Sequence, residues 1–539
     1  MAAPVVFGTG RITVSDLVGI ARDRRTVVLD VVALERIGAA RAIVERHLVA
    51  GVPVSGLNRE FGAPRDTHLT TEDVAAFQTR IIRDHLGGVG VPMPVESVRA
   101  MIAARLAGWS RGGAGIRVET AVFYAELLNR HVVPVVPTTG SVGDGDLTQL
   151  AAVAAVAIGE GHAFVDGEIV PGSEALSRAG LVPLQPQAHE GLTLVGHNSY
   201  SLGVGALALN DLDLLARAAD AAAALSFQAL AALGAGGNPG PFSAALLANS
   251  PSDGAKASGE RIRALLDGGV SRPEVTVQDP LAFRTAPQVN GSFVDVLAQA
   301  MSLIEDTLAV ASENPLVDAE TASIYSGGLF HIVPVATALD SVRAVIAQVA
   351  TSSERRLAAV SDANAVRRRN GTTRVPSLLW YASTDLVAEL RVLATPVSTG
   401  GAALSGGTEN VATFAATALR LLWRAAALLG DVIAIEALVA VDALGVLDEE
   451  DVDLDGAVGA AGAAGAAGEG AGDVSEPRDD SAPVGGQDHG SSTAPGSGAG
   501  GRKQLGPLSQ PLRARLEVVI DSGERGQEFV DAARAALEA

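Results

Sequence analysis

Apolar residues recur every three or four positions over much of the chain, which is the spacing of one face of an α-helix. Residues 70–86 are typical, because Val74 and Phe77 share this spacing and Thr70 with Asp73 resembles a helix-capping pair. The same pattern predicts helices over residues 95–106, 118–128, 192–231, 289–311, 332–360 and 409–444. Many of them are long and rich in alanine, as close helix packing requires. The sequence therefore predicts a mainly α fold, an elongated bundle of long helices.

Two segments interrupt this pattern. Residues 163–169, with Asp166-Gly167 between short apolar pieces, predict a small β-hairpin. Residues 456–501 contain almost no large apolar side chain, so they cannot bury enough surface to offset the entropy of ordering. We therefore divide the chain into three parts. They are a helical body at 1–447, an acidic flexible linker at 448–504, and a helical segment at 505–539 that docks on the body.

Composition narrows the possible functions. The chain has no cysteine, which excludes disulfides and thiolate metal sites. Its net charge is −21, and residues 448–488 hold twelve acids against one base. This acidic balance argues against nucleic acid as a partner, because the phosphates would be repelled. The histidines show no metal-ligand spacing and no glycine-rich phosphate loop is evident, so we expect neither a metal nor a nucleotide.

The same patterns argue against a membrane. The chain opens Met-Ala-Ala-Pro, without the basic and apolar regions of a signal peptide. The longest apolar tract, residues 419–447, is interrupted by charged residues such as Arg424 and Asp431. A bilayer span does not tolerate that many charges. We expect a buried bundle helix there, and a cytoplasmic protein.

The most informative motif lies at residues 140–147, which read Gly-Ser-Val-Gly-Asp-Gly-Asp-Leu. It resembles the active-site loop of the aromatic amino acid ammonia-lyases, the family of histidine, phenylalanine and tyrosine lyases. The family loop reads Gly-Ser-Val-Gly-Ala-Ser-Gly-Asp-Leu, and its Ala-Ser-Gly cyclises into an electrophile, the methylidene-imidazolone. Here the loop is one residue shorter, and Asp144 takes the place of the serine. An aspartate cannot lose water to form the reactive methylene, so we expect this cofactor to be absent.

Further motifs resemble the family in order and spacing over most of the chain. They include Gln78, His85, Gly115, Arg117, Glu190-Gly191-Leu192, Gln278-Asp279-Pro280, Arg284, Pro287-Gln288-Val289, Asn314-Pro315-Leu316 and Ser326-Gly327-Gly328 followed by Phe330-His331. The resemblance implies the family's helical fold, and a homotetramer with active sites shared between subunits.

The departures from the family concentrate on its reactive residues. The family's Tyr-Gly-x-Asn-Thr-Gly-Phe-Gly carries a catalytic tyrosine, whereas residues 55–62 read Ser-Gly-Leu-Asn-Arg-Glu-Phe-Gly, so Ser55 replaces that base. The family's Asn-Gly-Thr becomes Gly196-His197-Asn198. Leu281 and Leu329 replace a second tyrosine and an asparagine.

The candidate catalytic residues are Asp144, His197 and Ser55. Asp144 precedes an expected helix start, where the helix dipole and free N–H groups favour a carboxylate, so we expect a low pKa and attraction for a substrate ammonium. Helix capping explains the same aspartate equally well. His197 has the side chain of a general base, or it fills the space of the missing ring system.

The candidate ligand-binding residues are Arg284, His85, Glu409 and Asn198. Arg284 matches the family arginine that holds the substrate carboxylate, a task suited to a guanidinium, although a helix-start salt bridge is the alternative. His85 matches a position that lines the family's pocket for the substrate ring, and the pair His85-Leu86 resembles the tyrosine-selective members. Its position on the apolar face of the predicted helix, taken alone, would instead indicate a core histidine. Glu409 matches an acid that faces the substrate amine, or it caps the following helix.

These residues leave two main hypotheses. One is a divergent enzyme that binds an amino acid or related carboxylate and acts by acid–base chemistry without the electrophile. The other is an inactive paralogue that serves as a binding or assembly protein. An ordinary ammonia-lyase is a third reading, which the missing serine, tyrosine and asparagine disfavour.

Overall fold

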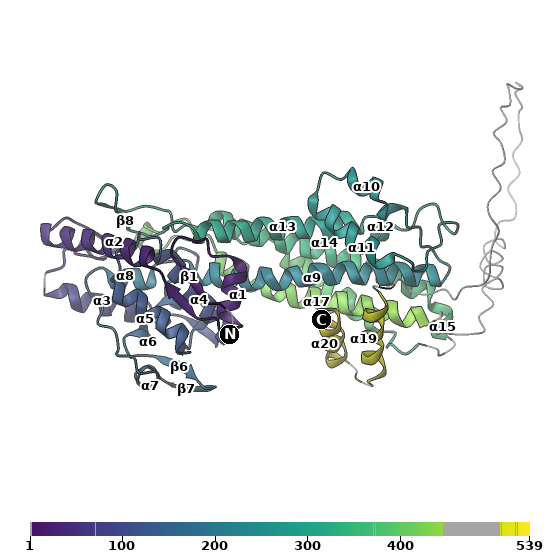
Figure 1. The fold of residues 1–539 in the computed structure, drawn as a ribbon, viewed down its shortest axis with the longest axis horizontal. Helices are drawn as coiled ribbons and strands as arrows, with labels where there is room; N and C mark the ends of the chain where they lie inside the picture. Colours follow the sequence, from purple (N-terminus) through teal and green to yellow (C-terminus); the bar gives the residue numbers. More distant parts are fainter. Residues whose placement is uncertain are drawn as a thin grey trace, which may run out of the picture.

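Long helices run side by side along an elongated molecule (Figure 1). The computed structural model describes residues 3–445 apart from 71, 370 and 372, and residues 507–538 apart from 508, 523 and 525. The linker expected at 448–504 lies outside the described residues. The mainly α fold expected from the hydrophobic spacing is confirmed.

The centre of the bundle consists of α9 (Ser199–Ala232), α13 (Ala286–Leu308), α14 (Val333–Ala363) and α17 (Ala415–Leu444). Their contact faces are built from alanine, leucine and valine; in α17, for example, Ala418, Leu422 and Leu429 are fully buried or nearly so. Small alanine side chains let neighbouring helices approach closely, and the longer side chains fill the remaining space.

Shorter helices surround this bundle. Those of the N-terminal half are α1 (Val14–Ala21), α2 (Val31–Ala50), α3 (Asp73–Asp84), α4 (Val95–Trp109), α5 (Val118–Asn129), α6 (Leu147–Ala157), α7 (Gly172–Arg178) and α8 (Glu190–Val195). Those of the other half are η1 (Gly240–Phe242), α10 (Ala244–Ala248), α11 (Asp253–Leu266), α12 (Leu281–Arg284), α15 (Ala365–Arg369), α16 (Leu379–Leu393), η2 (Ser405–Gly407), α19 (Gln510–Asp521) and α20 (Gln527–Glu538). The last two pack against α17 (Figure 1).

The strands form small sheets at the N-terminal end. One pair is parallel: β1 (Val5–Phe7) with β2 (Val27–Leu29). The other pairs are antiparallel: β3 (Val89–Pro92) with β5 (Pro137–Thr139), β4 (Val133–Pro134) with β6 (His162–Val165), β6 with β7 (Glu168–Pro171), and β8 (Leu316–Asp318) with β9 (Ser323–Tyr325). The hairpin expected at 163–169 is confirmed as β6–β7. Its turn residues Asp166 and Gly167 have φ of 51° and 86°, as a tight two-residue hairpin turn requires.

Two predicted helix boundaries were wrong, and both lie at the loop that the motif singled out. The helix expected at 192–231 is broken into α8 and α9 by residues 196–198, because the His197 carbonyl turns aside to accept the Asp146 N–H at 2.8 Å. The helix expected from residue 409 begins at Ala415, after Phe414, whose N–H donates to the Val142 carbonyl at 2.8 Å. As a result, the N-termini of α6, α9 and α17 all meet the loop.

Two helical stretches of the described chain are long and apolar enough to cross a membrane by length and composition alone. They are Glu190–Ala232 and Val333–Ala363, whose most apolar windows are 83% and 61% buried inside the protein. Core helices of a bundle have these same properties, and burial of this extent leaves little apolar surface for lipid.

Candidate functional site

Asp146 fixes the loop to its surroundings. Its carboxylate is fully buried and accepts hydrogen bonds from the Ser141 hydroxyl at 2.7 Å and the Ser201 N–H at 2.8 Å. Burial raises the pKa of Asp146 to about 6, and these donors counteract part of that rise. Asp146 thus joins the loop to the first turn of α9 and serves as a framework residue.

Gly143 packs against the residues before α17. The Thr413 hydroxyl donates to its carbonyl at 3.0 Å. A Cβ at Gly143 would lie 2.0 Å from the Thr413 hydroxyl oxygen and 2.8 Å from the Phe414 nitrogen, and its φ is 93°. Only glycine fits this position.

This packing bears on the cofactor that the family resemblance implies. Counted back from Asp146, Gly143 and Asp144 stand where the family has alanine and serine. The alanine would overlap Thr413, and the aspartate lacks the hydroxyl whose loss makes the methylene. The residues of this loop therefore do not fit the methylidene-imidazolone.

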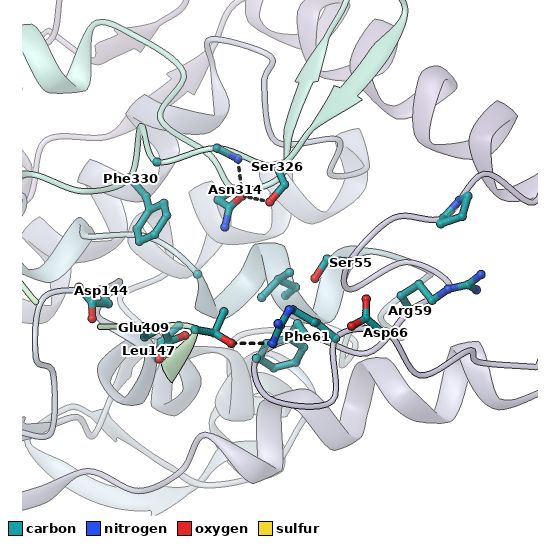
Figure 2. Close-up of a pocket in the computed structure, with 18 residues that line it drawn as sticks. Ser55, Arg59, Phe61, Asp66, Asp144, Leu147, Asn314, Ser326, Phe330 and Glu409 are labelled. Atoms are coloured by element: carbon teal, nitrogen blue, oxygen red, sulfur yellow. Dashed lines mark hydrogen bonds between the residues drawn. The ribbon is translucent and has the colours of Figure 1, made fainter. Parts of the chain in front are cut away.

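A pocket of about 590 Å³ opens beside the loop (Figure 2). Its walls come from the segment before α3, the loop itself with the start of α6, the segment before α14, and the residues before α17. The side chains that line it include Ser55, Arg59, Phe61, Arg65, Asp66, Asp144, Leu147, Asn314, Phe330 and Glu409. Its size is typical of sites for small molecules.

Asp144 is the most unusual side chain of this pocket. It is only 8% exposed, and neither carboxylate oxygen has a hydrogen-bond partner within the described residues. The Nε2 of His331 lies 3.6 Å from Oδ1 of Asp144. Burial raises the pKa of Asp144 to about 6; His331 lowers it and Glu409 raises it.

The low pKa expected for Asp144 was therefore wrong. Its carboxylate receives no backbone N–H, and the residue at the N-cap of α6 is Asp146, which makes no side-chain capping bond either. Proximity to a helix end stabilises a charge only when the N–H groups point at it. Asp144 is instead a desolvated carboxyl group facing a cavity.

Glu409 and Ser55 also line the pocket. Glu409 accepts a hydrogen bond from the Ser405 hydroxyl at 2.9 Å and lies on the same side of the pocket as Asp144 (Figure 2). The suggested role of Glu409 as a helix cap fails, because α17 begins six residues later, at Ala415. The pocket therefore has a carboxylate-rich side.

His85 does not line the pocket but contacts a residue that does. Its ring stacks on Phe61 with 5.3 Å between centroids, and its Nδ1 is 2.7 Å from the Ile81 carbonyl oxygen. Phe61 itself lines the pocket. His85 is thus placed to orient that ring rather than to contact a ligand directly.

His197 and Asn198 follow Gly196 of the pocket wall but do not line the pocket themselves. The His197 nitrogens are 2.6 Å from the Ser199 hydroxyl and 3.0 Å from the Ser312 hydroxyl, and burial lowers its pKa to about 3. A neutral, fully bonded imidazole suits a packing role better than that of a base acting on a ligand. Asn198 donates to the Phe330 carbonyl and so supports the pocket wall.

Arg284 does not reach this pocket within one chain. It closes α12, where its Nε donates to the Asp279 carbonyl at 2.7 Å. α12 lies toward the opposite end of the molecule from α6 and α8 (Figure 1). A role for Arg284 at the pocket would require a second subunit.

Sequence reasoning missed Arg59 and Arg65 as pocket residues. The sequence did contain an indication for Arg59, because the family has a threonine at the matching position. Within the part of the chain that the structure describes, no cluster of His, Asp or Glu could hold a metal ion.

Comparisons with known proteins agree with this architecture. Residues 12–464 match the family model described as aromatic amino acid lyase. The histidine ammonia-lyase of Stigmatella aurantiaca is 36% identical over 440 residues, covering 80% of this chain and 85% of that protein. The histidine ammonia-lyase of Caldanaerobacter subterraneus subsp. tengcongensis is 34% identical over 454 residues, covering 82% of this chain and 88% of that protein.

Among solved structures, the ergothioneine-degrading enzyme ergothionase from Treponema denticola shares the fold with a TM-score of 0.83 at 22% identity, covering 99% of this chain and 98% of that chain. A long-helix bundle with several helix starts around one loop and a pocket defines the class of this protein. The chain belongs to the aromatic amino acid lyase family.

Proposed function

We propose that this protein is a divergent member of its family that binds an amino acid or related carboxylate and acts on it by acid–base chemistry, without the methylidene-imidazolone. Asp144 carries the proposal, because it is a buried carboxyl group with no protein partner on the wall of a pocket. An ammonium group of a ligand would supply the missing partner. With a pKa of about 6, this carboxylate is ionised at neutral pH and can also accept a proton.

The carboxylate of the ligand requires a cationic partner. We assign this role to Arg284 of a neighbouring subunit in a homotetramer, as the family resemblance implies. Exposed apolar side chains support association: Leu281 beside Arg284 is 61% exposed, and Tyr381 and Val392 of α16 are 70% and 72% exposed. Surfaces of this kind commonly mark contacts between proteins.

The second candidate is an inactive binding or assembly protein. The loss of the electrophile favours it, since the residues at 143 and 144 do not fit that group. The open pocket opposes a role in assembly alone, because the site keeps room for a ligand. The relatives named histidine ammonia-lyase keep ammonia release as the reaction to test first.

The decisive experiment measures ammonia release from L-histidine, L-tyrosine, L-phenylalanine and glutamate, and release of degradation products from ergothioneine. Release by the native chain should be lost in Asp144→Asn and Arg284→Ala. Asp23→Asn, a solvent-exposed carboxylate in the turn after α1, is the matched control and should keep it. Absence of release from every compound would contradict the enzyme, and calorimetric binding of the same compounds would then test the binding protein.

A further inference from the structure

Charged side chains lie on two sides of the pocket. Asp144 and Glu409 lie on one side, and Arg59 lies on the other together with Asp66 (Figure 2). Phe61 and Leu147 line the space with apolar surface. A ligand that fills the pocket therefore meets carboxylates with one part and a guanidinium with another.

Arg59 has most of its hydrogen-bonding capacity free. Its guanidinium donates to the Asn58 carbonyl at 3.0 Å, and no ion pair to a carboxylate is formed within the described residues. A guanidinium has five N–H donors, so further bonds are available to a ligand. Arg65 donates to the Thr408 hydroxyl at 2.7 Å and likewise has no carboxylate partner in the described chain.

The backbone around Arg59 is held firmly. The Arg59 carbonyl accepts the Gly56 N–H at 2.9 Å, and the Arg59 N–H donates to the Val54 carbonyl at 3.2 Å. Asn58, which is buried, accepts the Val54 N–H at 2.9 Å and donates to the Val52 carbonyl at 2.8 Å. The loop thus presents Arg59 from a fixed position, which reduces the entropy that binding must overcome.

The covalent structure of amino acids decides which ligand group Arg59 would meet. The ammonium and carboxylate of an α-amino acid are attached to the same carbon, so both lie near Asp144 when the ammonium is bound there. The opposite side of the pocket then receives the end of the side chain. A cation at that place favours an acidic group.

We propose that Arg59 determines specificity by binding an acidic group at the end of the ligand's side chain, so that the substrate class is amino acids with acidic side chains. This inference rests on the proposed function, because it takes the ammonium to be at Asp144 and Glu409. Asp66 faces the same side of the pocket, but it forms no ion pair with either arginine in the described chain. Within the described chain, the guanidinium of Arg59 therefore forms no ion pair that a ligand would have to break.

The test uses pairs of compounds with the same shape and different charge. The probes are 4-carboxy-L-phenylalanine against 4-carbamoyl-L-phenylalanine, and L-glutamate against L-glutamine, with L-lysine as the opposite charge. Calorimetry on the full chain should show the acidic member of at least one pair binding roughly tenfold more tightly or better, as a charge-assisted bond implies. Arg59→Gln should abolish this preference, and Arg59→Lys should retain part of it.

The controls separate this inference from the proposed function. Arg46→Gln removes an exposed arginine of α2 and should leave both affinities unchanged. Binding that depends on Asp144 but ignores side-chain charge, or that favours lysine, overturns the role of Arg59 and keeps the amino acid site. A preference for the acidic probes that survives Asp144→Asn supports the role of Arg59 in binding an acidic group and contradicts the proposed function. No binding of any probe contradicts both.

Discussion

At the scale of single residues, the carboxyl group of Asp144 has the properties of a site kept for a ligand. A buried carboxylate without donors lowers the stability of the free protein, and such costs are typical of functional positions. A capping or packing role would have supplied a donor, as Ser141 and Ser201 do for Asp146.

Replacing this carboxylate should therefore stabilise the protein. The folded-state pKa of about 6 lies above the ordinary value of 3.8, so the folded chain binds more protons than the unfolded chain between these values. Stability is then lost as pH rises through this window, and Asp144→Asn escapes the loss. We expect Asp144→Asn to raise the free energy of unfolding by about 1–2 kcal/mol at pH 7.5 and to have little effect at pH 4. Urea titrations at both pH values measure this, and a destabilised variant at pH 7.5 would show that the carboxylate is structural.

His331 should tune the same carboxyl group. Its ring lowers the pKa of Asp144, so His331→Asn should raise that pKa further. The stability difference between the native and Asp144→Asn backgrounds would still begin near pH 4, but it would grow up to a higher pH and level off at a larger value. His47→Asn, on α2 and far along the chain, is the control, and an unchanged stability difference above pH 7 in His331→Asn would contradict the coupling.

At the scale of elements, the close contact between the loop and the start of α17 should be essential. Gly143→Ala places a methyl group 2.0 Å from the Thr413 hydroxyl oxygen. We expect a loss of about 2–4 kcal/mol in unfolding free energy. Gly167→Ala is the matched control, because Gly167 has a φ of 86° and no atom near its Cβ, so it reports backbone strain alone. Equal losses in the two variants would show that the Thr413 contact is unimportant.

The helices and the family loop were predictable from sequence, but the boundaries at the site were not. The spacing of apolar residues and the turn residues predicted the positions of α3, α4, α5 and the β6–β7 hairpin to within a few residues, because local sequence patterns determine these elements. The break before α9 depends on a hydrogen bond between Asp146 and His197, which are distant in sequence. The helical spacing of apolar residues continues across the break and therefore gave no sign of it. Asp144 stood out because it altered a known motif, whereas its raised pKa follows from burial that no motif encodes.

At the scale of the whole molecule, the distance between Arg284 and the pocket leads to a test of assembly. If each site takes Asp144 from one chain and Arg284 from another, two inactive variants can complement each other. Random mixing of Asp144→Asn and Arg284→Ala subunits should restore about a quarter of the native sites. Co-expression of the two variants, with ligand binding or product release as the readout, measures this fraction.

Each variant alone should remain inactive in the same assay. A mixture that recovers nothing while light scattering shows a mixed tetramer would contradict the shared site. A chain that remains monomeric would leave Arg284 without a place at the pocket.

The fit of Gly143 against Thr413 also bears on the evolutionary history of this protein. The family's loop would require an alanine inserted after Gly143 and a serine in place of Asp144. Neither change alone restores the electrophile, and the insertion lengthens a loop in which Gly143 is closely packed against Thr413. From the present sequence, mutation therefore has no single-step route to the family's electrophile.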